Sequence, residues 1–196
     1  MIIGLTGYKQ SGKSVAADYL QSKYNFVGHN FKTALIKELK ENFPDLLKAI
    51  VDNENGWNAA NDDLGNKDEN RKDWTIDQLF EEKPPLVRAL MKNYGTEFRR
   101  KEDLMYWVTK WQLTLPSLVE NNIVVDDVRF INDIQRVKQF GGKIIRIIKT
   151  GQINNDTHQT ESEIDSITPD YTIQANEGDH ESIYKQIDAI IDKLNK

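Results

Sequence analysis

The stretch GYKQSGKS at residues 7–14 decides the fold, because it matches the pattern GxxxxGK(S/T) of a phosphate-binding loop. An apolar run, Met1 to Leu5, stands directly before it and predicts the strand that such a loop follows. Backbone amides in this kind of loop point at phosphate oxygens, and the positive end of the next helix adds to their field. The alternative is a glycine-rich turn without a ligand, but the bare pattern arises by chance in only about one chain in a hundred of this size. The segment therefore predicts a nucleotide-binding protein, with Lys13 at the terminal phosphates and Ser14 on magnesium.

Composition and charge limit the classes of protein that fit. The chain has 196 residues, which suits a single domain with room for an insertion. Its 26 Lys and Arg against 31 Asp and Glu give a net charge of −5, which argues against binding nucleic acid through the overall field. The absence of cysteine excludes disulfides and thiolate metal sites. The loop comes too early for a signal peptide and no apolar run could span a membrane, so we expect a cytoplasmic protein.

Hydrophobic periodicity and turn residues give a coarse layout for the first part of the chain. The expected elements are a helix from the loop to Asn25, a strand at 26–29, a helix at 31–43, a further helix that could reach Val51, and a weakly structured polar insertion at 52–73. The insertion is predicted because residues 52–73 are mostly Asn, Asp, Lys, Glu and Gly.

The second part of the chain changes from helical to strand periodicity. The expected elements are a capped helix from Thr75, a helix from Pro85 that Gly95 ends, a helix from about Asp103 toward Pro116, strands at 122–127, 143–148 and 171–174, a helix at 132–140, and a last helix with Ile183 to Leu194 on one face. Two of these strands, at 122–127 and 143–148, have β-branched apolar residues at most of their inner positions, which is typical of central parallel strands. We therefore predict an α/β fold with a mostly parallel five-stranded sheet, and a helical insertion at about 31–118 that would hold a second substrate.

Acidic and basic residues follow the predicted strand at 122–127. Asp126 and Asp127 come at its end and Arg129 two residues later, at the sheet edge where the phosphate loop lies. An acid there can bind magnesium or accept a proton, and an arginine can hold a phosphate in bidentate fashion. The structural alternative is an exposed helix cap with Asp127 as the capping group.

Three further groups of residues have weaker signals. Arg88, Arg99 and Arg100 form a candidate anion clamp in the insertion, although an isolated arginine is usually a solvated surface charge. The stretch 157–161 lies in a polar segment, at about 149–168, that could close over phosphates like a lid. GTPase-like matches at 62–65 and 66–69 are read as accidents of an Asn- and Asp-rich segment.

Taken together, the motifs resemble those of the bacteriophage deoxynucleoside monophosphate kinases, within the wider group of P-loop nucleoside monophosphate kinases. The resemblance runs in order along the chain and is weakest between about 40 and 80. The segments that carry it are the arginine helix at 86–91, Tyr94-Gly95-Thr96-Glu97, Met105-Tyr106-Trp107-Val108, the DxR at 127–129, Gly151-Gln152 with NDTHQTE at 155–161, and Asn176-Glu177-Gly178. One departure is Lys92, where the family carries glutamine.

The resemblance implies a three-layer P-loop kinase fold and transfer of the γ phosphate of ATP to a deoxynucleoside 5′-monophosphate, with Mg²⁺ as cofactor. It implies catalytic roles for Lys13, Arg88, Asp127 and Arg129, and a metal site at Ser14 and Asp127. The implied ATP-binding residues are Gly7, Lys9, Ser11, Gly12, Lys13, Ser14, Val15, Asn176 and Gly178. The implied substrate-binding residues are Lys37, Arg88, Thr96, Glu97, Arg99, Trp107, Arg129, His158 and Glu161.

Two alternatives remain open. Another small-molecule P-loop kinase, such as a dephospho-coenzyme A kinase, would share the sheet and the loop. A nucleotide-binding regulatory module without transferase activity would need no second phosphate site. The partners expected are the two small-molecule substrates, with no nucleic acid and no membrane, in the host cytoplasm if the chain is phage-encoded; a homodimer is compatible with the sequence.

Overall fold

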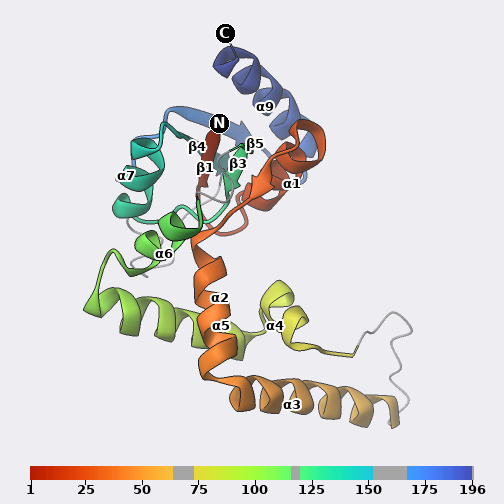
Figure 1. The fold of residues 1–196 in the computed structure, drawn as a ribbon. Helices are drawn as coiled ribbons and strands as arrows, with labels where there is room; N and C mark the ends of the chain where they lie inside the picture. Colours follow the sequence, from red (N-terminus) through yellow and green to blue (C-terminus); the bar gives the residue numbers. More distant parts are fainter. Residues whose placement is uncertain (64–72, 116–119, 152–166, 196) are drawn as a thin grey trace. The chain divides into compact units, whose positions relative to one another are not determined.

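The computed structural model describes residues 1–63, 73–115, 120–151 and 167–195 (Figure 1). The chain divides into two compact units, one made of residues 1–33 and 105–196 and the other of residues 34–104. Each unit is described by itself below. The predicted stretch with His158 and Glu161 lies outside the described residues.

The first unit contains a five-stranded sheet in which every strand pair is parallel. The strands are β1 (Ile2–Thr6), β2 (Val27–Gly28), β3 (Ile123–Val125), β4 (Lys143–Lys149) and β5 (Tyr171–Ala175), in the spatial order β2-β3-β1-β4-β5. This arrangement confirms the predicted α/β fold and all five predicted strands. The central strand β1 precedes the phosphate loop, so the loops after β3 and β4 lie on either side of it, because the carboxyl ends of parallel strands share one edge.

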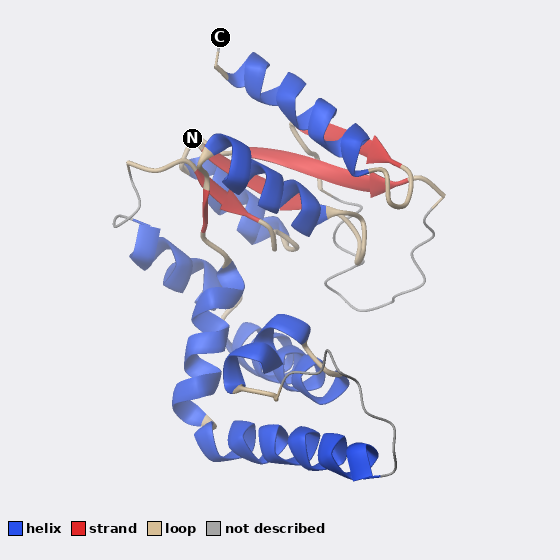
Figure 2. Cartoon of the chain, turned by 90° about the vertical axis from the view of Figure 1, so that its right-hand side faces the viewer, coloured by secondary structure: helices blue, strands red, loops and turns tan. Residues whose placement is uncertain are grey.

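Helices cover both faces of this sheet and make three layers (Figure 2). On one face lie α1 (Lys13–Tyr24) and α9 (His180–Leu194); on the other lie α6 (Tyr106–Thr114) and α7 (Ile131–Gln139). Alternate strand residues supply the two cores: Val124 and Ile145 face α1 and α9, whereas Ile123 and Ile144 face α6 and α7. Strands that are buried on both faces account for the apolar runs of the sequence.

The ends of two predicted helices fall at residues with left-handed backbone. Asn25 closes α1 at φ 55° and donates its N–H to the carbonyl of Leu20. Gly141 follows α7 at φ 75°, and its N–H reaches the carbonyl of Lys138. Glycine and asparagine tolerate this conformation, which explains why both helix ends could be predicted.

The second unit is helical. Its elements are α2 (Phe31–Asn42), which begins in the first unit, α3 (Pro44–Asp63), α4 (Ile76–Glu82), α5 (Pro85–Lys92) and a π-helical segment, η1 (Asn93–Arg100). The predicted capping box of α4 is present, since the Thr75 side chain accepts from the Gln78 amide and the Gln78 side chain accepts from the Thr75 amide. Among the described residues of both units, no helix is long and apolar enough to cross a lipid bilayer.

Two predictions for this unit were wrong. Residues 52–63 are helical, not weakly structured, because α3 starts favourably with Pro44 in its first turn and Asp45 next to it. Once a helix is nucleated, Asn and Asp reduce its stability by only about 0.7 kcal/mol per residue and do not end it.

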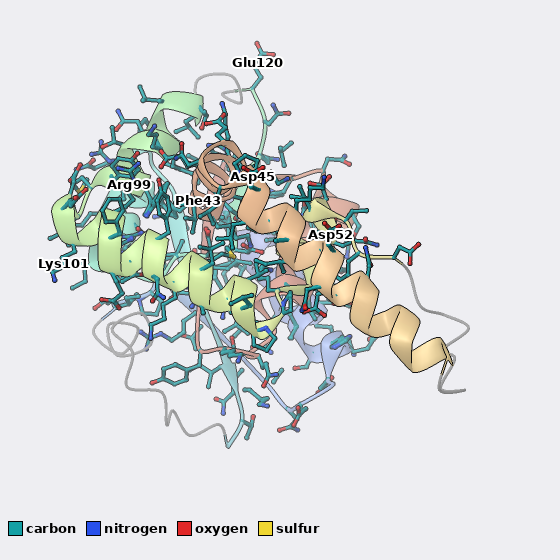
Figure 3. All side chains as sticks on the ribbon, turned by 90° about the horizontal axis from the view of Figure 1, so that it is seen from below. Phe43, Asp45, Asp52, Arg99, Lys101 and Glu120 are labelled. Atoms are coloured by element: carbon teal, nitrogen blue, oxygen red, sulfur yellow. The ribbon has the colours of Figure 1, made fainter. Side chains whose placement is uncertain are left out.

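The helix from Pro85 does not end at Gly95 but continues as η1 through Arg100. Gly95 serves close packing instead, since a Cβ there would approach Leu35 Cδ2 at 3.1 Å. Tyr94, beside it, contacts the ring of Phe43 edge-on, and Arg99 lies over the Tyr94 ring; Phe43 and Arg99 are labelled in Figure 3. A π-helix often marks a functional segment, and this one carries Thr96, Glu97 and the two arginines of the predicted clamp.

His29, at the end of β2, is buried in the first unit. Its Nε2 lies 3.2 Å from the carbonyl oxygen of Trp111, and the Trp111 indole N–H donates to the carbonyl of His29 at 2.8 Å. Burial lowers the pKa of His29 from its ordinary 6.5, and the hydrogen bond to Trp111 opposes this only in part.

We therefore expect His29 to destabilise the protein in acid. Below pH 6.5 the unfolded chain binds a proton at His29 that the folded chain resists, so stability present above pH 6.5 falls by at most about 1.4 kcal/mol per pH unit. Urea unfolding at pH 7.5 and pH 5 measures this loss. The variant His29→Gln, which keeps a donor for the Trp111 carbonyl, should lose less stability between the two pH values; an equal loss would contradict the assignment.

Candidate nucleotide site

The loop between β1 and α1 has the backbone that its glycines require. Gly7 adopts φ 143° and Gly12 φ 102°, conformations that L side chains rarely enter. A Cβ at Gly7 would lie 2.3 Å from the Ile147 carbonyl oxygen, and one at Gly12 would lie 2.9 Å from Ile183 Cδ1. The loop is thus packed directly on β4 and α9, and its path depends on both glycines.

Replacing Gly7 should therefore destabilise the protein. Gly7→Ala combines a disfavoured φ with a clash against backbone, and we expect it to lower the free energy of unfolding by about 3 kcal/mol. Gly141→Ala is the matched control, because Gly141 also has positive φ but has nothing within 4 Å of an added Cβ. That control should lose only about 1 kcal/mol. Urea unfolding compares the two, and equal losses would mean that the contact with Ile147 is unimportant.

Lys13 lies on the loop itself. Its ammonium donates to the carbonyl oxygens of Gly7 at 2.6 Å and Tyr8 at 2.7 Å. Ser14 follows Lys13 in the first turn of α1, and it is exposed to solvent. By contrast, the Ser11 hydroxyl oxygen is buried and has no hydrogen-bond partner within the described structure. These groups offer one cation and two hydroxyls beside the N-terminus of α1, which suits a phosphate chain and a hard cation.

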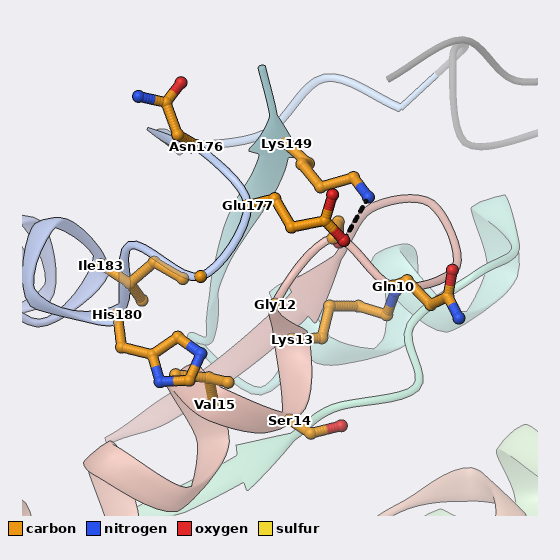
Figure 4. A pocket seen from close by; sticks show the side chains of 12 residues that line it. Gln10, Gly12, Lys13, Ser14, Val15, Lys149, Asn176, Glu177, His180 and Ile183 are labelled. Atoms are coloured by element: carbon orange, nitrogen blue, oxygen red, sulfur yellow. Dashed lines mark ion pairs between the residues drawn. The ribbon is translucent and has the colours of Figure 1, made fainter. Parts of the chain in front are cut away.

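A cavity of about 340 Å³ opens beside the loop (Figure 4). It is bounded by the phosphate loop, the start of α1, the end of β4, the turn after β5 and the start of α9. The lining residues are Gln10, Ser11, Gly12, Lys13, Ser14, Val15, Lys149, Asn176, Glu177, Gly178, His180 and Ile183. Seven of the predicted ATP-binding residues are among them, whereas Gly7 and Lys9 are not.

Sequence reasoning did not name several lining residues as ligand contacts, and it placed Lys149 at the start of the lid-like segment, whereas Lys149 is the last residue of β4. Lys149 and Glu177 form an ion pair of 3.3 Å in the cavity wall, and His180 and Ile183 line the cavity from α9. A signal was available for Lys149, because it ends the strand next to β1 and therefore lies at the edge of the phosphate loop. Nothing in the sequence pattern indicates that Glu177 pairs with it.

The loop after β3 is bound to the loop after β2. The Asp127 carboxylate accepts from the backbone amides of Phe31 at 3.1 Å and Lys32 at 2.7 Å, so it caps α2. The Lys32 ammonium lies 2.7 Å from Asp126. Burial raises the pKa of Asp127 to about 6, and the charge of Lys32 opposes the rise. Asp127 is therefore a helix cap, as the structural alternative expected. Each of its carboxylate oxygens still has a second lone pair that could bind a cation.

Arg129 lies in the same loop and is half-buried. Its backbone amide donates to the buried carboxylate of Asp133 at 3.1 Å, as does the amide of Phe130. Asp133 thus fixes the backbone between the end of β3 and the start of α7. This fixes the base of the Arg129 side chain at the carboxyl edge of the sheet.

The predicted substrate residues divide between the units. Lys37, Arg88, Thr96, Glu97 and Arg99 belong to the helical unit, whereas Trp107 and Arg129 belong to the sheet unit. Trp107 is only 3% exposed and packs edge-on against Tyr106, so most of its surface serves the core. Lys37 is exposed and lies 3.9 Å from Glu41.

Arg99 is part of a polar cluster within the helical unit. Its guanidinium donates to the Tyr94 hydroxyl at 2.8 Å and lies 3.4 Å from the Glu38 carboxylate. The Tyr94 hydroxyl in turn donates to Glu38 at 3.1 Å, and Asn42 donates to the same hydroxyl at 3.2 Å. Through these contacts Arg99 connects η1 to α2. Arg88, on α5, is exposed to solvent.

No group of three or more His, Cys, Asp or Glu side chains that could hold a metal ion occurs in the part of the chain that the structure describes. A site that relies on many protein carboxylates is therefore not formed by these residues. Magnesium bound mainly by phosphates and water needs few protein ligands, and Ser14 with Asp127 supplies oxygen donors of the right kind.

A parallel sheet with a glycine-dependent phosphate loop after its central strand, a lysine on that loop and a cavity beside it define a P-loop nucleotide-binding protein. The family model described as deoxynucleotide monophosphate kinase matches residues 67–187, more than half of the chain. The chain belongs to the deoxynucleotide monophosphate kinase family. Membership makes it a phosphotransferase and supports the phosphorylation of deoxynucleoside monophosphates.

Two sequence relatives carry the name of this family. A protein of Acanthamoeba polyphaga mimivirus that carries the family name provisionally is 28% identical over 100% of this chain and 98% of its own length. The deoxynucleotide monophosphate kinase of Escherichia phage RB69 is 28% identical over 54% of this chain, but the match spans only 44% of the phage protein. Among solved structures, a dephospho-CoA kinase from Campylobacter jejuni aligns over 100% of this chain and 98% of its own, with 16% identity and a TM-score of 0.48.

Proposed function

We propose that this chain transfers the γ phosphate of ATP to the 5′ phosphate of a deoxynucleoside monophosphate, giving a deoxynucleoside diphosphate and ADP. The observation that carries the proposal is the pairing of a phosphate loop and its cavity with an acid and an arginine on the neighbouring loop of the same sheet edge. Membership in the family supports the acceptor class.

In the proposed donor site, the loop amides and Lys13 hold the phosphate chain of ATP. Lys13 leaves the carbonyl oxygens of Gly7 and Tyr8 for the phosphate oxygens, which carry more negative charge. Ser14 and Asp127 are the residues proposed to hold Mg²⁺, which would neutralise part of the negative charge of the phosphates during transfer.

In the sheet unit, Arg129 is the residue proposed to hold the acceptor phosphate. In the helical unit, Arg88 is the residue proposed to bind phosphate, and Thr96, Glu97 and Arg99 are proposed to bind the nucleoside. An oxygen of the acceptor phosphate attacks the γ phosphorus, and the bond from that phosphorus to the oxygen of the β phosphate breaks. No side-chain nucleophile is needed. Lys13 and the arginines offset the charge that spreads over the phosphoryl oxygens in the transition state.

One assay tests the reaction and its acceptor. ADP release is followed with ATP, Mg²⁺ and each of the four deoxynucleoside monophosphates, with dephospho-coenzyme A, and with no acceptor. We expect release that depends on at least one deoxynucleoside monophosphate. Release with dephospho-coenzyme A alone, or release that needs no acceptor, would contradict the proposal. The cytoplasm, of the host cell if the gene is viral, is the compartment proposed for this reaction, because it supplies both substrates.

A further inference from the structure

Lys149 is a cation of the nucleotide cavity that the phosphate-loop motif does not include. It is the last residue of β4, the strand that pairs with β1 on the side opposite β3. Ile147, two residues earlier, contributes the carbonyl oxygen on which Gly7 packs and belongs to the core under α1 and α9. Side chains two residues apart share a face of a strand, so Lys149 emerges on the face that bears the cavity.

Lys149 is held by a carboxylate at the neighbouring strand end, since Lys149 lies beside Ala175 of β5, two residues before Glu177. Its Nζ lies 3.3 Å from Glu177 Oε1, and the two side chains are 20% and 83% exposed. Glu177 lies in the turn between Asn176 and Gly178, where Gly178 adopts φ 77° (Figure 4). A pair with one partner so exposed contributes little stability, because water screens it and the free side chain loses entropy on pairing.

The arrangement of charge suggests what this pair does. Among the charged residues lining the cavity, Lys13 and Lys149 are cations and Glu177 is an anion. Both cations contact protein oxygens: Lys13 contacts backbone carbonyls, and Lys149 contacts a carboxylate. A triphosphate offers lysine denser negative charge than one exposed carboxylate does, so it competes well for Lys149.

We propose that Lys149 is a second lysine contact for the phosphate chain of the nucleotide, and that Glu177 is a resident anion which gives up Lys149 when the nucleotide binds. This inference rests on the proposed function, since it concerns the same ATP site. Glu177 then has two opposing effects on affinity: it holds the Lys149 side chain in one position at the cavity wall, and it competes with phosphate for that lysine. The competition outweighs the positioning effect, because an exposed carboxylate such as Glu177 restricts the Lys149 side chain only weakly.

The competing interpretation is a structural tie. In that case the pair merely joins the end of β4 to the turn after β5, and loss of either partner would act on stability alone. The two interpretations differ in the sign of the Glu177 effect on ATP affinity. A structural tie gives weaker or unchanged binding when Glu177 is neutralised, whereas competition gives tighter binding.

Calorimetric titration of the full chain with MgATP, and separately with inorganic tripolyphosphate, tests the proposal. Lys149→Met should weaken both ligands about tenfold, and Glu177→Gln should tighten both about two- to threefold. Lys185→Met is the matched control, since Lys185 pairs with Glu181 at 3.8 Å on α9 outside the cavity lining. That control should leave both affinities unchanged.

Three results would overturn the inference: unchanged ATP affinity in Lys149→Met, a loss for ATP without a loss for tripolyphosphate, or weaker or unchanged binding in Glu177→Gln. If Lys149→Met does not fold, as judged by circular dichroism, the sign of the Glu177→Gln effect decides alone. Absence of ATP binding by the unmodified chain would instead refute the proposed function, so the two failures are distinguishable.

Discussion

Lys13→Ala abolishes phosphoryl transfer: we expect turnover to fall by about a thousandfold or more. Lys13 lies on the phosphate loop, and its ammonium is held over the loop by the carbonyls of Gly7 and Tyr8. No other described lysine lies both on this loop and in the cavity lining. Without it, the charge that develops on the transferring group loses a cation of the phosphate loop. Coupled detection of ADP at saturating acceptor measures the loss.

The control for this variant removes a lysine elsewhere. Lys185 lies on the exposed side of α9, so the variant Lys185→Ala should keep the turnover of the unmodified chain. Thermal unfolding of both variants excludes a general loss of structure. Full activity in Lys13→Ala would make the assignment of the phosphate loop untenable.

Arg129→Ala should separate transfer from nucleotide binding. Arg129 lies on the loop after β3, and its base is fixed by the Asp133 carboxylate. A guanidinium that binds the acceptor phosphate and the transferring oxygens contributes about a thousandfold to turnover in phosphoryl transfer. Because ATP is held by the loop before α1, its affinity should stay within about twofold. Turnover from the coupled assay and ATP affinity from calorimetry give the two numbers.

Arg136→Ala is the matched control for this charge. Arg136 lies on α7, a short distance along the same segment, and its guanidinium donates to the Gln112 side chain at 2.6 Å. We expect it to retain turnover. Unchanged turnover in Arg129→Ala would remove Arg129 from its proposed role, and an equal loss in Arg136→Ala would indicate that only the net charge of the segment matters.

Local patterns explain why the sheet could be predicted from the sequence. Apolar runs such as residues 143–148 indicate strands that are buried on both faces, and the glycines of the phosphate loop indicate a backbone that only glycine adopts. The capping box at Thr75 and the turn at Gly141 depend on neighbours within a few residues. Each of these signals is complete within a short window.

Tertiary contacts explain why the rest could not be predicted. Gly95 looks like a helix end, but its small size serves packing against Leu35, which lies far away in the sequence. Asp127 caps a helix that starts about ninety-six residues earlier in the chain. The Lys149–Glu177 pair likewise joins two strand ends. No periodicity encodes such contacts, and the predicted roles of Arg88, Arg99 and Arg129 stay predictions.

The π-helical form of η1 determines which way its arginines face. Hydrogen bonds from each residue to the fifth one before it widen the turn, so every step rotates the chain less about the axis than an α-helical step does. In this wider turn the Arg99 guanidinium donates to the hydroxyl of Tyr94, five residues before it. If the segment tightened into an α-helix, Arg99 and Arg100 would swing to a different side relative to α5 without any change in composition. The rotation per residue, rather than residue type alone, therefore sets the orientation of this basic pair.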